Sequence, residues 1–136
     1  MSVSPYVFFG GECAAAFGRY QEVLGGELEI MTHADLPEGE EGMPGARPEH
    51  VMHAALKVGD TLLMGSDDPT SDGGAKVGVA VVYTAPDAVE AERVFTALTE
   101  GGAVHVPFAP TFWSKGFGAG LDRFGVPWMI DTAGEV

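Results

Sequence analysis

Apolar residues recur at helical spacing in two stretches of the chain. Within each stretch, neighbouring apolar residues lie three or four positions apart, which places them on one face of an α-helix. The two stripes consist of Cys13, Phe17, Tyr20 and Leu24, and of Ala88, Ala91, Phe95 and Leu98. A glycine pair follows each stripe, and glycine readily adopts the left-handed conformation that commonly ends a helix. The pattern predicts two helices that end at Gly25-Gly26 and at Gly101-Gly102.

The second of these helices also has a start signal. Asp87 and Glu90 form an acidic version of a capping box, and Pro86 lies just before them. In such a box the first side chain accepts a hydrogen bond from a free backbone N–H of the first turn. We therefore expect this helix to begin at Asp87.

The remaining apolar runs are short and are predicted to be strands. Twenty glycines and nine prolines favour many turns and short strands. The predicted strands are Val3–Phe9, Glu27–Thr32, His50–Val58, Thr61–Met64, Val77–Tyr83, Ala103–Phe108, Gly116–Leu121 and Pro127–Asp131. Combined with the helices, the order is strand, helix and three strands, and then the same again. This internal repeat predicts an α+β fold made of two tandem βαβββ modules.

The two halves differ mainly by one insertion. The segment from Gly26 to Gly59 is ten residues longer than the matching segment from Gly102 to Gly125. We assign the excess to a mobile loop, residues 35–49, which is rich in Glu, Gly and Pro and has no periodicity. We predict a first module at residues 1–68 and a second at residues 69–136, which together form one domain. A single α+β sandwich without internal symmetry is the alternative.

Short motifs occur in a characteristic order along nearly the whole chain. They are Tyr6-Val7-Phe8-Phe9-Gly10-Gly11, His53-Ala54-Ala55-Leu56, Leu62-Leu63-Met64-Gly65-Ser66-Asp67, Phe112-Trp113 and Asp122-Arg123-Phe124-Gly125-Val126-Pro127-Trp128. With the tandem modules, this order resembles the vicinal oxygen chelate superfamily, which includes glyoxalase I, bleomycin-resistance proteins and extradiol dioxygenases, and in particular its PhnB-like branch. The resemblance implies curved mixed sheets that face each other around a cup, and usually a homodimer. Whether the modules pair within one chain or between two chains stays open.

Composition narrows the classes of function. The 136 residues are 46% hydrophobic and 20% charged, and the formal net charge is −13. This excess of negative charge repels phosphate backbones and anionic lipid surfaces, so it argues against nucleic-acid and membrane partners. We find no apolar run of membrane-spanning length and no secretory signal, and the single cysteine, Cys13, cannot form an internal disulfide. We therefore expect a soluble cytoplasmic protein.

The resemblance also implies where a divalent metal would bind. The relevant positions lie near Pro5 or Tyr6, near Met64 or Gly65, near Gly78 and near Met129, and only the Tyr6 phenol offers a hard side-chain ligand. We therefore predict no metal site and no cofactor. His50 and His53 do not change this prediction, because on a strand their odd spacing sends the two rings to opposite faces.

His53 is the side chain best suited to chemistry. It lies between Val51 and Ala55 in an apolar strand, and imidazole titrates near neutral pH. We interpret it as a cup-facing hydrogen-bond donor or general base, with a hydrogen-bonded core histidine as the alternative. Asp67 and Asp122 are candidates for a second ionisable group, but we expect both at strand ends, facing solvent.

Aromatic residues suggest the walls of a ligand site. Aromatic side chains with a polar handle are common at such walls, although a cluster of them in the second module also fits an ordinary core. Lys115 either meets an anionic substrate group or extends into solvent, and Cys13 is interpreted as a small buried residue. The predicted ligand-binding residues are Tyr6, Phe8, His53, Phe112, Trp113, Lys115 and Trp128.

Two functions compete, and whether the protein is an enzyme stays open. The first is binding of a small molecule without a metal; the charge of −13 favours a cationic or aromatic ligand. The second is a lyase or isomerase acting on a small oxygenated metabolite, with His53 as the acid–base group. A module whose cup is filled by its own side chains is a third possibility, because a fold does not dictate a function.

Overall fold

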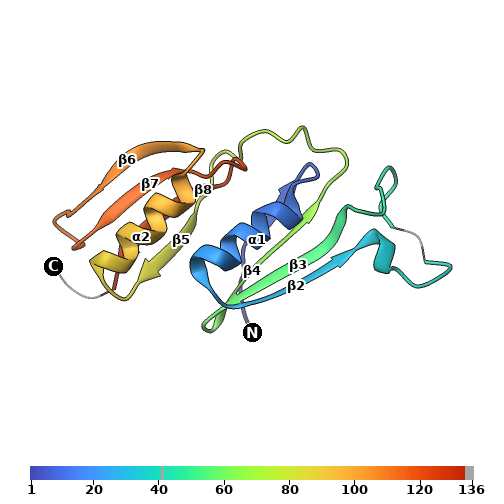
Figure 1. Cartoon of the computed structure of the whole chain (residues 1–136), viewed down its shortest axis with the longest axis horizontal. Helices are drawn as coiled ribbons and strands as arrows, with labels where there is room; N and C mark the ends of the chain where they lie inside the picture. Colours follow the sequence, from blue (N-terminus) through green and yellow to red (C-terminus); the bar gives the residue numbers. More distant parts are fainter. Residues whose placement is uncertain (41, 134–136) are drawn as a thin grey trace. The chain divides into compact units, whose positions relative to one another are not determined.

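The computed structural model of the chain describes residues 1–40 and 42–133. The chain divides into two compact units, residues 1–73 and residues 74–136. Each unit contains one α-helix and one four-stranded sheet (Figure 1). Residue 41, in the predicted loop insertion, and residues 134–136, at the end of the predicted second module, lie outside the described part.

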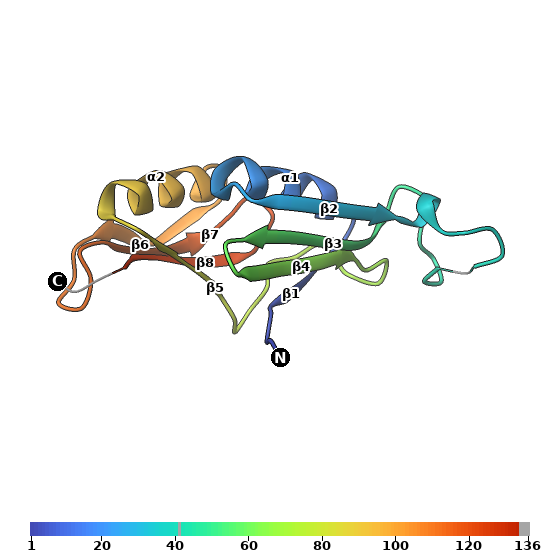
Figure 2. The same ribbon diagram turned by 90° about the horizontal axis from the view of Figure 1, so that it is seen from below.

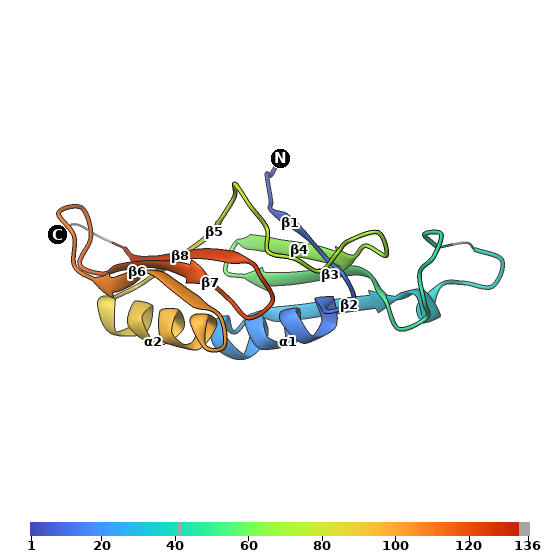
Figure 3. The same cartoon turned by 90° about the horizontal axis from the view of Figure 1, so that it is seen from above.

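The first unit is a βαβββ module. Its elements are β1 (Tyr6–Phe9), α1 (Cys13–Leu24), β2 (Glu27–Thr32), β3 (Val51–Val58) and β4 (Thr61–Asp67). The strands lie in the order β1-β4-β3-β2; β1 is parallel to β4, and the other pairs are antiparallel. A short 3-10 helix, His33–Asp35, begins the connection from β2 to β3. Figure 3 shows this connection leaving the sheet beyond the ends of the two strands.

The second unit repeats this topology without the long connection. It contains β5 (Val81–Ala85), α2 (Ala88–Thr99), β6 (Ala103–Ala109), β7 (Phe117–Leu121) and β8 (Pro127–Thr132). The order is β5-β8-β7-β6, again with one parallel pair, β5 and β8. The predicted α+β fold of tandem βαβββ modules is confirmed, and both sheets are open rather than closed into barrels.

Each helix covers one face of its own sheet and leaves the other face without a helix (Figure 2). The core of each unit therefore lies between helix and sheet. In the first unit the rings of Phe9, Phe17 and Tyr20 pack edge to face, and all three residues are at most 1% exposed. In the second unit Phe95 of α2 and Trp128 and Ile130 of β8 are buried. Among the residues that the structure describes, no helix has the length and apolar character needed to cross a membrane.

The glycine pairs predicted to end the helices do so, and they have a second role. Gly25 and Gly101 adopt positive φ angles of 76° and 80°. The second glycine of each pair lies against a backbone carbonyl of its own sheet, Gly26 against Lys57 and Gly102 against Leu121. A Cβ atom at either position would overlap that carbonyl oxygen. In both modules, therefore, the end of the helix lies close to the sheet through the same contact between a glycine and a backbone carbonyl.

Two predicted strands begin too early. β1 starts at Tyr6 and β5 at Val81, not at Val3 and Val77. Val3 and Val77 are 103% and 89% exposed, so these apolar residues do not pack against either sheet. In contrast, β4 continues past its predicted end at Met64 to Asp67, because its last residues pair with β1.

Candidate ligand-binding site

The helix-free face of the first sheet carries exposed aromatic side chains. Phe9 of β1 packs against Phe17 of α1. Because side chains alternate along a strand, Tyr6 and Phe8 point to the opposite face of the sheet. Tyr6 is 40% exposed and Phe8 is 50% exposed. Their ring centroids are 5.1 Å apart. Two predicted ligand-binding residues therefore lie together at a surface that the helix does not cover.

His53 lies beside these rings. Its neighbour Ala54 is fully buried, whereas His53 is exposed and its ring centroid is 6.1 Å from that of Tyr6. Met31 of β2, opposite His53 in the register, is 46% exposed. The interpretation of His53 as a buried core histidine is therefore wrong. The imidazole is accessible, and both of its nitrogens can serve as hydrogen-bonding groups.

His50, in contrast, is buried and hydrogen-bonded within the protein. It precedes β3 and is 8% exposed. Its Nδ1 atom accepts a hydrogen bond from the backbone N–H of Arg47 at 3.0 Å, and its carbonyl accepts one from the N–H of His33. This histidine stabilises the connection between β2 and β3.

Asp67, expected to face solvent, is buried at 3% exposure. One carboxylate oxygen accepts hydrogen bonds from the backbone N–H groups of Gly11 and Cys13, at 2.9 and 3.0 Å. The other accepts one from the N–H of Val51 at 2.8 Å. The expectation is wrong because the end of β4 lies beneath the start of α1, where backbone donors lack partners.

Asp122 is buried for a different reason. It lies in the turn between β7 and β8 and is 4% exposed. Its Oδ1 atom accepts hydrogen bonds from the N–H groups of Phe124 and Val126, and its Oδ2 atom accepts one from the indole of Trp128, each at 2.9 Å. The expectation of a solvent-facing carboxylate is wrong here too. Trp128, predicted to contact a ligand, is 2% exposed and belongs to the core.

The other predicted residues of the second unit gather between β6 and β7. Phe112 and Trp113 are 90% and 52% exposed, and their ring centroids are 4.8 Å apart. The Trp113 ring also contacts that of Phe117, the first residue of β7, at 5.6 Å. Lys115 is exposed. Phe112, Trp113 and Lys115 thus belong to one exposed segment next to the sheet.

Asp131 of β8 is a polar residue that the sequence analysis missed. Ile130 and Thr132 are buried at 0% and 6% exposure, so alternation places Asp131 on the helix-free face. Its register partners are Phe117 of β7 and Thr84 of β5. Its Oδ1 atom is buried and has no hydrogen-bond partner among the residues that the structure describes. The predicted strand Pro127–Asp131 includes this residue, and the alternation from Trp128 onwards is the signal that places it on the same face as Met129.

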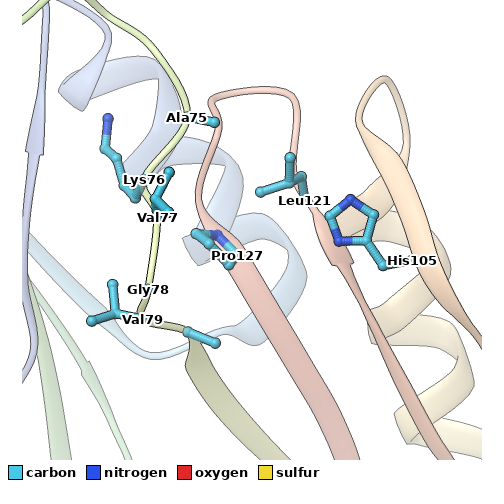
Figure 4. A pocket seen from close by; sticks show the side chains of 9 residues that line it. Ala75, Lys76, Val77, Gly78, Val79, His105, Leu121 and Pro127 are labelled. Atoms are coloured by element: carbon cyan, nitrogen blue, oxygen red, sulfur yellow. The ribbon is translucent and has the colours of Figure 1, made fainter.

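A pocket of about 570 Å³ lies in the second unit (Figure 4). Its walls are residues 75–80, His105 of β6, Leu121 of β7 and Pro127 of β8. Most of the lining side chains are aliphatic, and the amine of Lys76 donates a hydrogen bond to the carbonyl of Gly74. Small-molecule pockets are typically about 300–1,000 Å³ and largely apolar. This pocket is wide open to solvent, so it is a shallow surface depression rather than an enclosed ligand site.

Comparison with known proteins places these features in a family. A family profile described as 3-demethylubiquinone-9 3-methyltransferase matches residues 1–131. The chain belongs to this family. It is 31% identical to Protein YjdN of Escherichia coli (strain K12), over 97% of this chain and 95% of that protein. It is 41% identical to protein PA1353 of Pseudomonas aeruginosa, whose crystal structure superposes with a TM-score of 0.83 and covers 97% of both chains.

More distant structures share the fold alone. A Bacillus cereus protein described as a putative 3-demethylubiquinone-9 3-methyltransferase, PhnB protein, is 23% identical, with a TM-score of 0.77 over 98% of this chain and all of that one. Two structures of the glyoxalase/bleomycin resistance/dioxygenase group have TM-scores of 0.62 and 0.61 at 13% and 12% identity. These comparisons confirm the glyoxalase-like fold that the resemblance implies.

The metal positions implied for this superfamily can now be located. Tyr6 pairs with Met64 across β1 and β4. β5 begins only at Val81, so the strand residue opposite Met129 is Val82 rather than Gly78. These positions offer one phenol and two thioethers, a poor match to the imidazole and carboxylate ligands of a divalent ion such as zinc. Among residues 1–40 and 42–133, no group of three or more His, Cys, Asp or Glu residues is arranged to hold a metal ion.

Cys13, the first residue of α1, does not have an activated thiol. Burial and, to a lesser extent, the negative charge of Asp67 together raise the pKa of the thiol to about 12. These two effects outweigh the helix N-terminus, which by itself would lower a thiol pKa. The residue is 0% exposed, in agreement with its interpretation as a small core residue.

Proposed function

We propose that this protein binds a small organic molecule with an aromatic or cationic part, without a divalent metal. One observation supports this most strongly: Tyr6, Phe8 and His53 form an exposed cluster on the first sheet, away from the helix. Exposed rings cost solvation free energy unless something covers them. A flat aromatic ligand would cover them, and His53 would supply one directional hydrogen bond.

The charge of the protein supports the cationic part of the proposal. A net charge of −13 raises the local concentration of cations and speeds their association. One protein of similar fold, 13% identical to this chain, is described as a bleomycin resistance determinant, and a binding role for this chain agrees with that likeness. Homodimerisation and a cytoplasmic location belong to the same proposal.

Isothermal titration calorimetry against a panel of basic aromatic antibiotics and metabolites tests the proposal. We expect saturable binding by at least one compound. Tyr6→Ala and His53→Ala should each weaken that binding about tenfold, because each removes a contact worth roughly 1.4 kcal/mol. Tyr6→Phe keeps the ring and should retain most of the affinity.

Val89→Ala is the matched control. Val89 is 81% exposed on α2, so its truncation changes an apolar surface residue far from the aromatic cluster in sequence and should leave the affinity unchanged. Absence of saturable binding across the panel, or equal losses in the control, would contradict the proposal.

A second candidate function rests on the same cluster. The phenol of Tyr6 and the imidazole of His53 are neighbours on an accessible face, and such a pair can donate and accept a proton. A lyase or isomerase would use His53 as its acid–base group. If a substrate is found, His53→Ala should lower turnover at least about 100-fold; full turnover in that variant would remove His53 from the mechanism.

The family description also names a methyltransferase activity. Incubation with a methyl donor and a demethylated quinol, followed by mass spectrometry of the quinol, tests it directly. Methylated product would replace the binding proposal with a catalytic one.

A further inference from the structure

Among the described residues, the Oδ1 atom of Asp131 is the buried side-chain nitrogen or oxygen that lacks a hydrogen-bond partner. The carboxylates of Asp67 and Asp122 each accept at least three hydrogen bonds from the protein. Leaving a buried polar atom unpaired lowers the stability of a folded protein. Asp131 therefore has the environment of a group whose partner comes from outside the described residues.

The neighbours of Asp131 indicate what that partner is. Phe117 lies directly opposite Asp131 across β7 and β8. Gly118 follows Phe117 and faces α2, because a Cβ atom there would lie 2.7 Å from the Phe95 ring. Phe117 therefore points to the same helix-free face as Asp131. Opposed residues on one face have Cβ atoms about 5 Å apart, so the ring and the carboxylate are within reach of one small ligand.

Trp113 extends this aromatic surface. Its ring lies 5.6 Å from that of Phe117 and is about half exposed. Thr84 flanks Asp131 on the other side, from β5, and is exposed. A cation next to a carboxylate and the faces of aromatic rings gains from both interactions. The combination suits an aromatic ligand that carries a protonated amine or a guanidinium group.

We infer that Asp131 is the anionic anchor of a site for an aromatic organic cation, with Phe117 and Trp113 as its ring-binding wall. This inference goes beyond the proposed function, because every residue of the site belongs to the second unit and Asp131 is the residue that selects a cation. The cationic group of the ligand pairs with the carboxylate of Asp131, and its ring packs on Phe117 and Trp113. The net charge of −13 favours approach of the same class of ligand.

Nuclear magnetic resonance titration of the full chain with three probes tests the inference. Benzylammonium, benzyl alcohol and benzoate share a ring and differ in charge. We expect benzylammonium to shift the amide resonances of Phe117, Thr84 and Asp131 with a dissociation constant on the order of 1 mM. Benzyl alcohol should bind about tenfold more weakly or not at all, and benzoate should not shift these resonances.

Two variants separate the carboxylate from general charge effects. Asp131→Asn keeps the shape of the side chain and should weaken benzylammonium binding at least tenfold. Glu92→Gln removes one negative charge from an exposed position on α2 and should change the dissociation constant less than twofold. Trp113→Ala should weaken benzylammonium and benzyl alcohol to a similar extent.

A stability measurement distinguishes a binding residue from a structural one. If the Asp131 oxygen has no partner within the protein, Asp131→Asn should raise the urea concentration at the unfolding midpoint. A lower midpoint would mean that the carboxylate stabilises the fold, and would overturn the inference.

The outcomes also separate this inference from the proposed function. Equal binding of benzylammonium and benzyl alcohol, unaffected by Asp131→Asn, would leave ring binding intact and remove the cation anchor. No shifts at this face with benzylammonium at tens of millimolar would also overturn the inference, whereas the cluster at Tyr6, Phe8 and His53 is tested by its own calorimetric titration.

Discussion

The two helices begin in different ways, although their modules share one topology. The Asp87 side chain, immediately before α2, accepts a hydrogen bond from the N–H of Glu90 at 2.8 Å. Glu12, in the same place before α1, makes no such bond. Instead, the carboxylate of Asp67 reaches the start of α1 from the end of β4, 54 residues further along the chain. One helix is capped locally and the other by tertiary structure.

The difference shows how a repeated fold can rest on unequal interactions. Asp87 satisfies one donor of the first turn of α2. Asp67 accepts from Gly11 and Cys13 and also from Val51 at the start of β3, so it joins helix, β3 and β4 at one point. Removing Asp67 should therefore affect the whole first module, whereas removing Asp87 should affect only one helix end.

The largest effect is expected for Asp67→Ala. Asp67 is 3% exposed, so its removal leaves three backbone N–H groups buried without partners. This should lower the free energy of unfolding by about 4 kcal/mol. Urea unfolding followed by circular dichroism measures this. Asp60→Ala, at an exposed turn between β3 and β4, is the control and should change the free energy by less than about 0.5 kcal/mol. A loss below about 1 kcal/mol for Asp67→Ala would contradict the tertiary cap.

The glycines after the two helices share one contact, in contrast to the caps. Gly26→Ala and Gly102→Ala each force a Cβ atom against a backbone carbonyl, which should cost about 3 kcal/mol. Gly26→Ala should cost about 1 kcal/mol more, because Gly26 has a φ of 90°. Gly18→Ala, inside α1 with no atom within 4 Å of the new Cβ position, should stabilise the protein by about 0.5–1 kcal/mol. Thermal and urea unfolding of the three variants test this. A loss below about 1 kcal/mol at either helix end would show that the modules do not share this contact.

Asp87→Ala should have a smaller effect than either of these. It removes a single capping hydrogen bond, and such substitutions typically cost about 1 kcal/mol. Asp87→Asn retains an acceptor and should behave almost like the native protein. If Asp87→Ala destabilised the protein as much as Asp67→Ala, the distinction between a local and a tertiary cap would fail.

The smallest effect at neutral pH concerns Cys13. With a thiol pKa of about 12, the native protein at pH 8 should react with a thiol reagent about 1,000-fold more slowly than the unfolded chain. The raised pKa also determines the direction in which stability changes with pH. Stability is unaffected below about pH 9, and it decreases as the pH rises from about 9 towards 12, because only the unfolded state loses its proton there. Rapid labelling of the native protein at pH 8 would show that the first turn of α1 opens readily.

Much of the fold could be predicted because its signals are local. The stripes through Phe17 and Phe95, the glycine pairs and the start at Asp87 all depend on residues a few positions apart. The strand starts at Val3 and Val77 were wrong because a run of apolar residues does not show whether a sheet partner exists. Only half of the capping box formed: the carboxylate of Glu90 pairs with Arg93 instead of the N–H of Asp87.

The candidate site could be predicted only in part. The motifs drew attention to Tyr6, Phe8 and His53, and these three do lie together on one sheet. Trp128 looked like its aromatic neighbours but is buried with Asp122, since a turn brings its indole beside that carboxylate. No sequence motif marks Asp131, because what distinguishes it is that its Oδ1 atom lacks a hydrogen-bond partner within the described residues. Such a feature is visible only in the tertiary structure.

By itself, the sequence determined the repeat, the two helices and the approximate positions of most strands, because backbone geometry responds to spacing over one or two turns. The tertiary structure decided which acidic residues are buried and what each of them contacts. Asp67, Asp122 and Asp131 are chemically the same side chain. Their different environments arise from segments that meet across strand pairs and at a helix end, and the free energy of a carboxylate depends on the donors that reach it.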